Sequence, residues 1–248
     1  MSGGLQASCE IAVIGGGIAG SALAALLARS GRDVLLLEKD RFPRHKLCGE
    51  FLSAESQGLL RRVGCLDEVL ALRPARITQG RFFAPSGRDA VFDLGGTALG
   101  VSRWSLDALL FRHARSSGAS ADEGARVARL EGVSGASRLS VEWDDGRRST
   151  VEARLVVGAY GRRSPLDAQL ARAFLSGPAC ALGLKRHHRP ADTEAGRRLF
   201  SELGGRVEIH LFQDGYCGLS RVEGGLVNVC LLLEKRLLQS LAAPRWDE

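Results

Sequence analysis

A glycine-rich turn between an apolar strand and a helix constrains this chain most strongly. Residues 10–14 (EIAVI) are typical of a short buried strand, and residues 19–30 are rich in the alanine and leucine that favour a helix. The turn between them is Gly15–Gly20 (GGGIAG). A second apolar run, Val34–Leu37, ends in Glu38 and is typical of a parallel strand buried on both faces. This order predicts a βαβ unit of about 30 residues.

The turn fits the pattern G-x-G-x-x-G, which gives each glycine a physical role. Gly15 permits the tight turn, Gly17 lets the backbone approach a pyrophosphate, and Gly20 lets the helix and strand pack closely. The helix N-terminus offers free N–H groups to phosphates. Glu38 is placed to accept hydrogen bonds from ribose hydroxyls, which disfavours NADP in this slot. The pattern predicts a dinucleotide site and does not distinguish FAD from NAD. The alternative interpretation is a glycine-rich turn in an α/β protein of another kind.

The remaining periodicity predicts an α/β chain with a second, mainly antiparallel region. After residues 164–165 the sequence pattern changes to segments of alternating apolar and polar residues, typical of antiparallel strands, separated by glycine-rich turns. Helices are expected at 53–63, 66–72 and 105–117, with a last one starting near Lys235. Strands are expected at 77–84, 90–94, 126–130, 139–143, 150–157, 179–186, 206–212, 218–222 and 226–233.

Composition excludes several classes of protein. The net charge of +6 is scattered along the 248 residues and not gathered in a stripe, which argues against nucleic-acid binding. Six cysteines without a CxxC pair argue against a disulfide framework and against a zinc site, so no metal is expected. No run approaches the ~20 apolar residues of a membrane span, and no secretory signal is evident, so a cytoplasmic location is expected.

Four further segments, in the same order along the chain, resemble geranylgeranyl-reductase-like flavoproteins of the wider para-hydroxybenzoate-hydroxylase-type family of FAD enzymes. The segments are Arg41–Glu50 (RFPRHKLCGE), Ser102–Asp107 (SRWSLD), Gly124–Val127 (GARV) and Val156–Ser164 (VVGAYGRRS). The resemblance implies a Rossmann-like FAD-binding domain of the glutathione-reductase (GR2) type with an inserted, mainly antiparallel substrate domain. The implied bounds are 1–72 and 97–165 for the FAD-binding domain, and 73–96 and 166–248 for the substrate domain.

The resemblance also implies which residues serve the cofactor. They are Gly15, Gly17, Ile18, Ala19, Gly20, Glu38, Lys39, Arg44, Lys46, Arg103, Val127, Gly158 and Gly161. For Arg44 and Lys46 the alternative is a solvated side chain. Cys48 is the candidate catalytic residue, because by resemblance it faces the flavin or the substrate channel, and neighbouring basic residues would lower its pKa. Its alternative is a small buried apolar residue beside a tight turn.

Two departures from the family pattern bear on function. Tyr160 replaces the Asp of the Gly-Ala-Asp-Gly motif, which in the family is linked to FAD and to the nicotinamide donor. The family's second Gly-Asp motif, which supports the ribityl chain and flavin ring, has no match after Val229. We therefore expect the chain to be a fragment, a truncated product or half of a split enzyme. We expect it to hold FAD weakly by itself, with a partner chain supplying the missing motif.

The sequence thus predicts an FAD-dependent oxidoreductase that reduces a carbon–carbon double bond of an isoprenoid or other apolar substrate, with NADPH or NADH as reductant. One alternative is an FAD-dependent monooxygenase that hydroxylates or epoxidises an apolar or aromatic substrate. A halogenase of the same fold ranks last, because its Lys-bearing and Trp-bearing motifs are missing. A truncated, non-catalytic flavoprotein is the non-enzyme alternative. The expected partners are a small apolar substrate and peripheral contact with a membrane.

Overall fold

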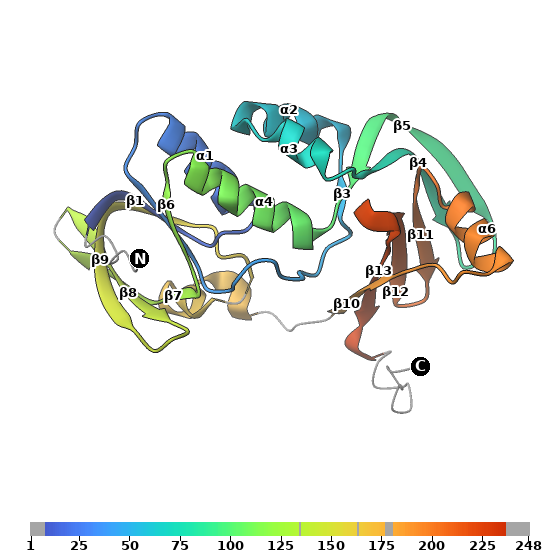
Figure 1. The fold of residues 1–248 in the computed structure, drawn as a ribbon. Helices are drawn as coiled ribbons and strands as arrows, with labels where there is room; N and C mark the ends of the chain where they lie inside the picture. The colour runs from blue at the N-terminus through green and yellow to red at the C-terminus, as the bar shows by residue number, and fades with distance from the viewer. Residues whose placement is uncertain (1–7, 134, 163, 177–180, 237–248) are drawn as a thin grey trace. The chain divides into compact units, whose positions relative to one another are not determined.

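The computed structural model describes residues 8–133, 135–162, 164–176 and 181–236, which form two compact units with one β-sheet each (Figure 1). The first unit comprises residues 1–45, 63–65 and 104–177. The second comprises residues 46–62, 66–103 and 178–248. In the described residues, no helix is long and apolar enough to cross a membrane.

The sheet of the first unit joins a parallel part to an antiparallel part. Its strand order is β6-β2-β1-β9-β8-β7, in which β1 pairs in parallel with β2 and β9, and β2 pairs in parallel with β6. The pairs β9–β8 and β8–β7 are antiparallel. The strands are β1 (Ser8–Ile14), β2 (Val34–Glu38), β6 (Ser120–Glu123), β7 (Ala125–Val133), β8 (Ala136–Trp143) and β9 (Arg148–Gly158). Every residue of β2 is buried, as expected for a parallel strand covered on both faces.

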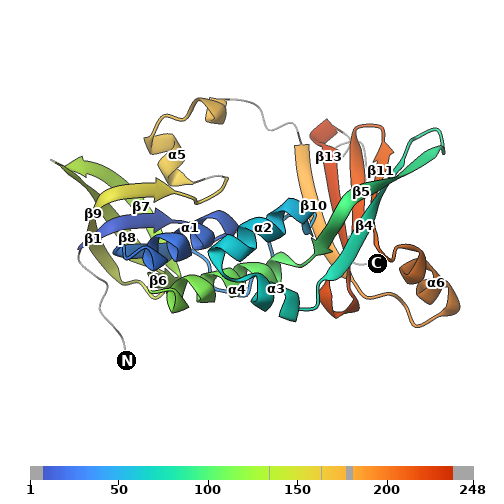
Figure 2. The ribbon, with the colours of Figure 1, turned by 90° about the horizontal axis from the view of Figure 1, so that it is seen from above.

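Helices cover one face of this sheet and its own antiparallel strands cover the other. Helices α1 (Ile18–Arg29) and α4 (Arg103–Ser116) lie side by side (Figures 1 and 2), and buried alanines such as Ala24 let α1 approach the strands closely. On the other face, Ile14 and Leu37 form one core cluster with residues of β7 and β8, among them Val127 and Trp143. The two shorter helices are α5 (Pro165–Gln169) and the 3₁₀ turn η1 (Ala173–Ser176).

The second unit is built on a seven-stranded sheet in the order β10-β13-β12-β11-β4-β5-β3. The β4–β11 pair is parallel and the other pairs are antiparallel. The strands are β3 (Phe51–Leu52), β4 (Ala75–Phe83), β5 (Asp89–Gly100), β10 (Ala181–His188), β11 (Arg206–Phe212), β12 (Gly215–Arg221) and β13 (Val227–Glu234). The helices are α2 (Ala54–Val63), α3 (Leu66–Ala71), α6 (Glu194–Glu202) and the 3₁₀ turn η2 (Glu223–Gly225).

The predicted fold class is confirmed, with local differences. The expected strand at 90–94 extends to Gly100, because β5 keeps pairing with β4 after a bulge near Ile77. Helix α6 was not expected, and the helix expected near Lys235 lies almost wholly outside the described residues. The compact units also divide the chain differently from the expected domains, because β3 (Phe51–Leu52) pairs with β5 and draws residues 46–62 into the second unit. Whether the expected bounds separate a cofactor domain from a substrate domain stays a prediction.

Candidate functional site

The glycine turn has the geometry that its sequence predicts. The Gly15 N–H donates to the Leu37 carbonyl at 2.7 Å, which ties the turn to the end of β2. Gly15 has a φ of 107°, in the region that favours glycine, so this position needs a residue without a side chain. A methyl group on Gly20 would overlap the Gly15 carbonyl oxygen. The close packing of helix on strand therefore depends on Gly20 as well.

The N-terminus of α1 presents unpaired backbone donors. Gly17 is its N-cap, no side chain caps it, and its first turn holds no acidic residue. The first four N–H groups of a helix have no partner within the helix, and the helix dipole adds partial positive charge there. Ser21 turns inward instead, where its hydroxyl donates to the Gly16 carbonyl at 2.8 Å. This end of α1 is thus suited to a phosphate.

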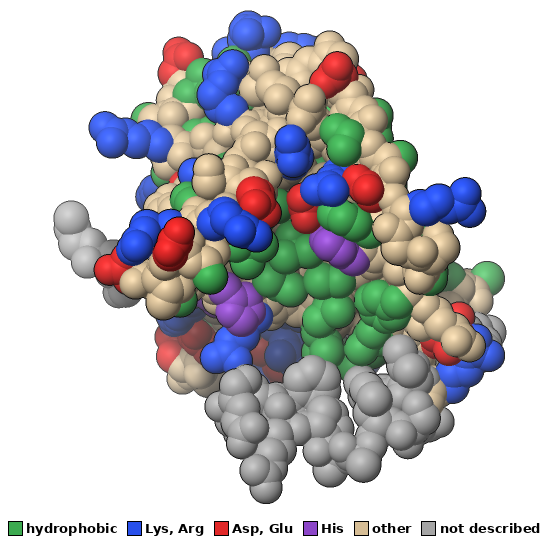
Figure 3. Space-filling view, turned by 90° about the vertical axis from the view of Figure 1, so that its right-hand side faces the viewer, with side chains coloured by type: hydrophobic (Ala, Val, Ile, Leu, Met, Phe, Trp, Pro, Cys, Tyr) green, Lys and Arg blue, Asp and Glu red, His purple; other side chains and the backbone are tan. Residues whose placement is uncertain are grey.

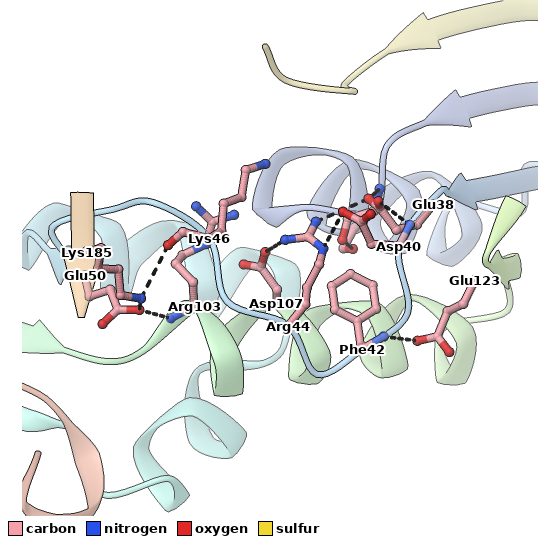
Figure 4. Close-up of polar contacts among 12 residues, drawn as sticks. Glu38, Asp40, Phe42, Arg44, Lys46, Glu50, Arg103, Asp107, Glu123 and Lys185 are labelled. Atoms are coloured by element: carbon pink, nitrogen blue, oxygen red, sulfur yellow. Dashed lines mark hydrogen bonds and ion pairs between the residues drawn. The ribbon is translucent and has the colours of Figure 1, made fainter. Parts of the chain in front are cut away.

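The Glu38 carboxylate is buried and held by backbone donors. It is 4% exposed, and its Oε2 accepts the Gly16 N–H at 2.7 Å (Figure 4). Its Oε1 accepts the Asp40 N–H at 3.0 Å. A carboxylate offers about four lone-pair positions, so both oxygens keep capacity for further donors. The geometry fits a pair of ribose hydroxyls.

Arg44 sits among three carboxylates of the same unit, as Figure 4 shows. Its guanidinium lies 3.3 Å from Asp107, 3.5 Å from Glu38 and 3.1 Å from Asp40, the last without the alignment of a hydrogen bond. The Arg44 side chain is 14% exposed, so the alternative of a solvated arginine is wrong. Its positive charge offsets the cluster of acids around Glu38. A contact between Arg44 and cofactor phosphates stays a prediction.

These elements surround a pocket of about 310 Å³ in the first unit, a volume within the range of small-molecule sites. The pocket is lined by Ile14, Gly15, Leu37, Glu38, Lys39, Ala125, Arg126, Val127, Tyr160, Ser164 and Pro165. Gly15, Glu38, Lys39 and Val127 were predicted from the sequence, and the structure brings them together here. Of the other lining residues, Ala125, Arg126, Tyr160 and Ser164 belong to matched segments without having been assigned a role, and the rest had no motif to mark them.

Tyr160 takes a structural position at the edge of this pocket. Its ring lies where a side chain on Gly158 would otherwise be, and its hydroxyl donates to Asp167 Oδ1 at 3.2 Å. Asp167 is buried and forms the capping box of α5 with Ser164. The following residue, Gly161, has a φ of 74°, so glycine suits this turn. Gly158 and Gly161 therefore serve local packing and turn geometry, whatever else they contact.

Cys48 lies in the second unit, on a backbone segment fastened to the sheet. Its Sγ accepts the Glu50 N–H at 3.4 Å, and its carbonyl accepts the Asn228 side-chain amide at 3.1 Å. The Lys46 carbonyl accepts from Lys185 Nζ at 3.4 Å (Figure 4). The thiol is half-buried. The structure thus gives segment 46–50 a defined position on β10 and β13.

Glu50 is the buried anchor of that segment, and sequence reasoning did not single it out. It is 2% exposed, has a φ of 57°, and forms an ion pair with Lys185. His187 Nε2 lies 2.5 Å from Glu50 Oε2, and the Arg103 N–H donates to Oε1 at 2.7 Å. Lys185 and His187 alternate along β10 and so share one face. No local signal links residues so far apart in the chain.

Comparison with known proteins decides the family. Residues 8–183 match the family described as FAD binding domain, which is more than half of the chain. The chain belongs to this FAD-binding domain family. Its cofactor is FAD, so the alternative of NAD in the glycine-turn pocket is set aside.

Relatives of the FAD-binding domain span more than one chemistry. The flavin-dependent halogenase rdc2 of Metacordyceps chlamydosporia is 40% identical over 124 residues, which are 50% of this chain and 24% of the relative. The menaquinone reductase of Mycobacterium tuberculosis is 33% identical over 172 residues, 66% of this chain and 40% of the relative. The chain therefore spans about a quarter to two fifths of these relatives. A flavoprotein/dehydrogenase structure from Cytophaga hutchinsonii superposes with a TM-score of 0.79 at 22% identity, covering 95% of this chain and 58% of that one.

The predicted FAD residues fall into two groups. The first unit holds Gly15, Gly17, Ile18, Ala19, Gly20, Glu38, Lys39, Arg44, Val127, Gly158 and Gly161, around the turn, the α1 N-terminus and the pocket. Lys46, Arg103 and the candidate catalytic Cys48 belong to the second unit. The roles of these residues toward FAD stay predictions. Among the described residues, no group of three or more His, Cys, Asp or Glu is arranged to hold a metal ion.

Proposed function

We propose that this chain forms the FAD-binding part of an oxidoreductase that reduces a carbon–carbon double bond of an isoprenoid or other apolar substrate. The observation that carries the proposal is the pocket in which the Gly15 turn and Glu38 meet, beside the α1 N-terminus. The similarity to menaquinone reductase supports the reductase chemistry. So does the resemblance of Arg41–Glu50 to geranylgeranyl-reductase-like flavoproteins.

Each part of the pocket has a role toward the adenosine half of FAD. The N–H groups of the first turn of α1 bind the pyrophosphate, because they are unpaired and lie at the positive end of the helix. Glu38 accepts from the ribose hydroxyls, and the backbone near Val127 meets the adenine. Bound FAD supplies the redox chemistry, and the protein supplies position and surroundings.

The second sheet carries an apolar row suited to an apolar substrate. Leu47, beside Cys48, fills the space left by Gly183 on β10. Across the sheet from Gly183, the directly opposed residues are Leu232, Tyr216 and Leu211. All three are between a third and a half exposed. An exposed apolar row that begins at the segment carrying Cys48 supports a small apolar substrate on this face.

The second candidate function is a flavin-dependent halogenase or monooxygenase. The 40% identity to halogenase rdc2 favours it, so the comparisons do not support the low rank that the missing motifs suggested. NADPH or NADH as reductant, peripheral membrane contact and a partner chain that supplies the second Gly-Asp motif remain further parts of the proposal. A non-catalytic flavoprotein is the outcome if neither chemistry is found.

The test begins with the purified chain and added FAD. Flavin absorbance near ~370 and ~450 nm that stays with the protein through desalting establishes binding. The holoprotein is then reduced anaerobically with NADPH or NADH and mixed with a short-chain menaquinone, and the product is analysed by mass spectrometry. Reduction of the quinone ring to the quinol also adds two hydrogens, so the product is reoxidised in air before analysis. Two added hydrogens that remain in the isoprenoid chain support the reductase. Product that forms only with oxygen, and carries oxygen or a halogen, favours the second candidate and contradicts the first.

A further inference from the structure

A second cavity lies within the second unit, between α6 and the sheet. Its volume is about 690 Å³, and most of its lining is apolar, including Phe83, Leu199, Leu219 and Val229. Figure 3 shows hydrophobic side chains gathered on this side of the molecule, with histidines beside them. The volume is that of a site for a small organic ligand.

This cavity opens on the sheet face opposite the one that carries segment 46–50. Asn228 of β13 reaches the Cys48 carbonyl, whereas its neighbours Val227 and Val229 line the cavity. Successive residues of a strand point to opposite faces, so the two sites are separated by the thickness of the sheet. The cavity is therefore distinct from the face proposed above for the flavoenzyme substrate.

Helix α6 is tied to the sheet at one end and stands off it at the other. Near its C-terminus the Phe200 ring lies under the Arg221 guanidinium at 3.8 Å, and Leu203 is buried. None of the nine residues of α6 is buried, and Leu199 is 68% exposed although it lines the cavity. A helix whose apolar side covers an apolar sheet would normally bury that side. Here a cavity lies between the helix and the sheet instead.

The charges deep in the cavity are already compensated. Arg81 is paired with Asp89 at 2.7 Å and lies 4.0 Å from Glu208. His210 Nε2 lies 3.1 Å from Glu208, and the His210 ring stacks on Phe83 with centroids 4.1 Å apart. This wall offers a flat aromatic surface and no uncompensated charge. It suits the apolar body of a ligand.

The mouth of the cavity carries positive charge that is not compensated. Its source is Arg189, which lines the mouth, is exposed and forms no ion pair with any residue that the structure describes. Of the two acids in the lining, Glu202 is paired with Arg198 at 3.2 Å and Glu208 with His210. An apolar interior with a basic mouth matches a molecule with an apolar body and one anionic head.

We propose that this cavity binds an amphipathic monocarboxylate, such as a medium-chain fatty acid, with its chain between α6 and the sheet and its carboxylate beside Arg189. The proposal is independent of the flavin chemistry. It assigns a role to α6, which the FAD pocket does not use.

The probe is decanoate below its micelle concentration, titrated into the full chain by isothermal calorimetry, with decanol as the neutral match. We expect a Kd on the order of 100 µM for decanoate, which is typical affinity for a ligand of this size. Saturating FAD should not displace it. Arg189→Gln should weaken decanoate about three- to fivefold, as for an exposed ion pair, and leave decanol unchanged. Arg138→Gln, at an exposed arginine of β8 that does not line the cavity, is the matched control.

Leu199→Glu tests the apolar wall at an exposed position where the fold tolerates the change, with circular dichroism to check folding. It should abolish binding of both ligands. Three results would overturn the proposal. The first is no heat with decanoate from folded protein, and the second is equal loss of affinity in Arg189→Gln and Arg138→Gln. The third is a concentration-dependent dimer that Leu199→Glu dissociates, which would show that a second copy covers this face.

Discussion

Glu38→Gln isolates what the carboxylate does for the cofactor, because it changes the charge and leaves the size. In the folded protein each Glu38 oxygen accepts one backbone N–H, from Gly16 at 2.7 Å and Asp40 at 3.0 Å. The Gln amide group has only one acceptor oxygen, so one of these donors would face an NH₂ group. Leaving a buried donor unpaired costs about 1–3 kcal/mol of unfolding free energy. For a chain of this size that lowers the Tm by roughly 2–12 °C.

The effect on FAD is a separate quantity. The two ribose hydroxyls would no longer donate hydrogen bonds to a charged acceptor. The binding free energy of FAD should fall by about 1.5–3 kcal/mol, which raises the Kd roughly 10- to 150-fold. The assay is flavin fluorescence titration at a temperature where both proteins are folded. FMN, which lacks the adenosine ribose, should bind wild type and Glu38→Gln equally. Glu123→Gln, at an acid of the same unit outside the pocket, should leave FAD affinity unchanged. Unchanged FAD affinity in folded Glu38→Gln would refute the assignment of the ribose to Glu38.

Three further predictions concern packing, buried charge and thiol chemistry. Gly20→Ala should lower the free energy of unfolding, measured by chemical denaturation, by about 3 kcal/mol or more, because the new methyl group overlaps backbone atoms. Gly58→Ala in α2, with open space around it, should raise the free energy of unfolding by about 0.5–1 kcal/mol. Equal effects of the two substitutions would contradict the role of Gly20 in packing. Glu50→Gln should lower the free energy of unfolding by about 3–5 kcal/mol, because Lys185 is left buried without its partner. The double variant with Lys185→Met should recover part of that free energy, because it removes the unpaired charge. Burial raises the pKa of the Cys9 thiol to about 11, so iodoacetamide at pH 8 should leave Cys9 unmodified in folded protein and label it on unfolding; fast labelling of the folded chain would contradict this.

The first unit could be predicted from the sequence because its signals are local. The strand at 10–14, the turn at Gly15–Gly20 and the run ending in Glu38 are short patterns whose residue types are dictated by neighbouring backbone. Val127 was found only through resemblance, because a strand residue facing a pocket has no special composition. The pocket itself, with Arg126 beside it, required the structure.

The second unit was less predictable because its key contacts join distant segments. Nothing near Glu50 in the sequence indicates that Lys185 and His187 will enclose it. Helix α6 was missed because its nine residues, EAGRRLFSE, are mostly polar and fewer than the window over which helical periodicity is recognised. Arg44 is surrounded by acids, and one of them, Asp107, comes from the distant helix α4, so no local pattern could indicate this cluster. Its contact with the cofactor stays a prediction.

The order of strands in the second sheet has a consequence for how the chain is made. Strands β3, β4 and β5 are synthesised early, but the only neighbour of β4 on its other side is β11, which pairs with it in parallel. Residues 84–205 must all be synthesised before that edge can be covered. During translation the nascent hairpin therefore carries an unpaired edge, which is a template for intermolecular pairing. Ribosome-bound chains that stop before residue 206 should accordingly need chaperones more than chains that continue through β13 (Val227–Glu234).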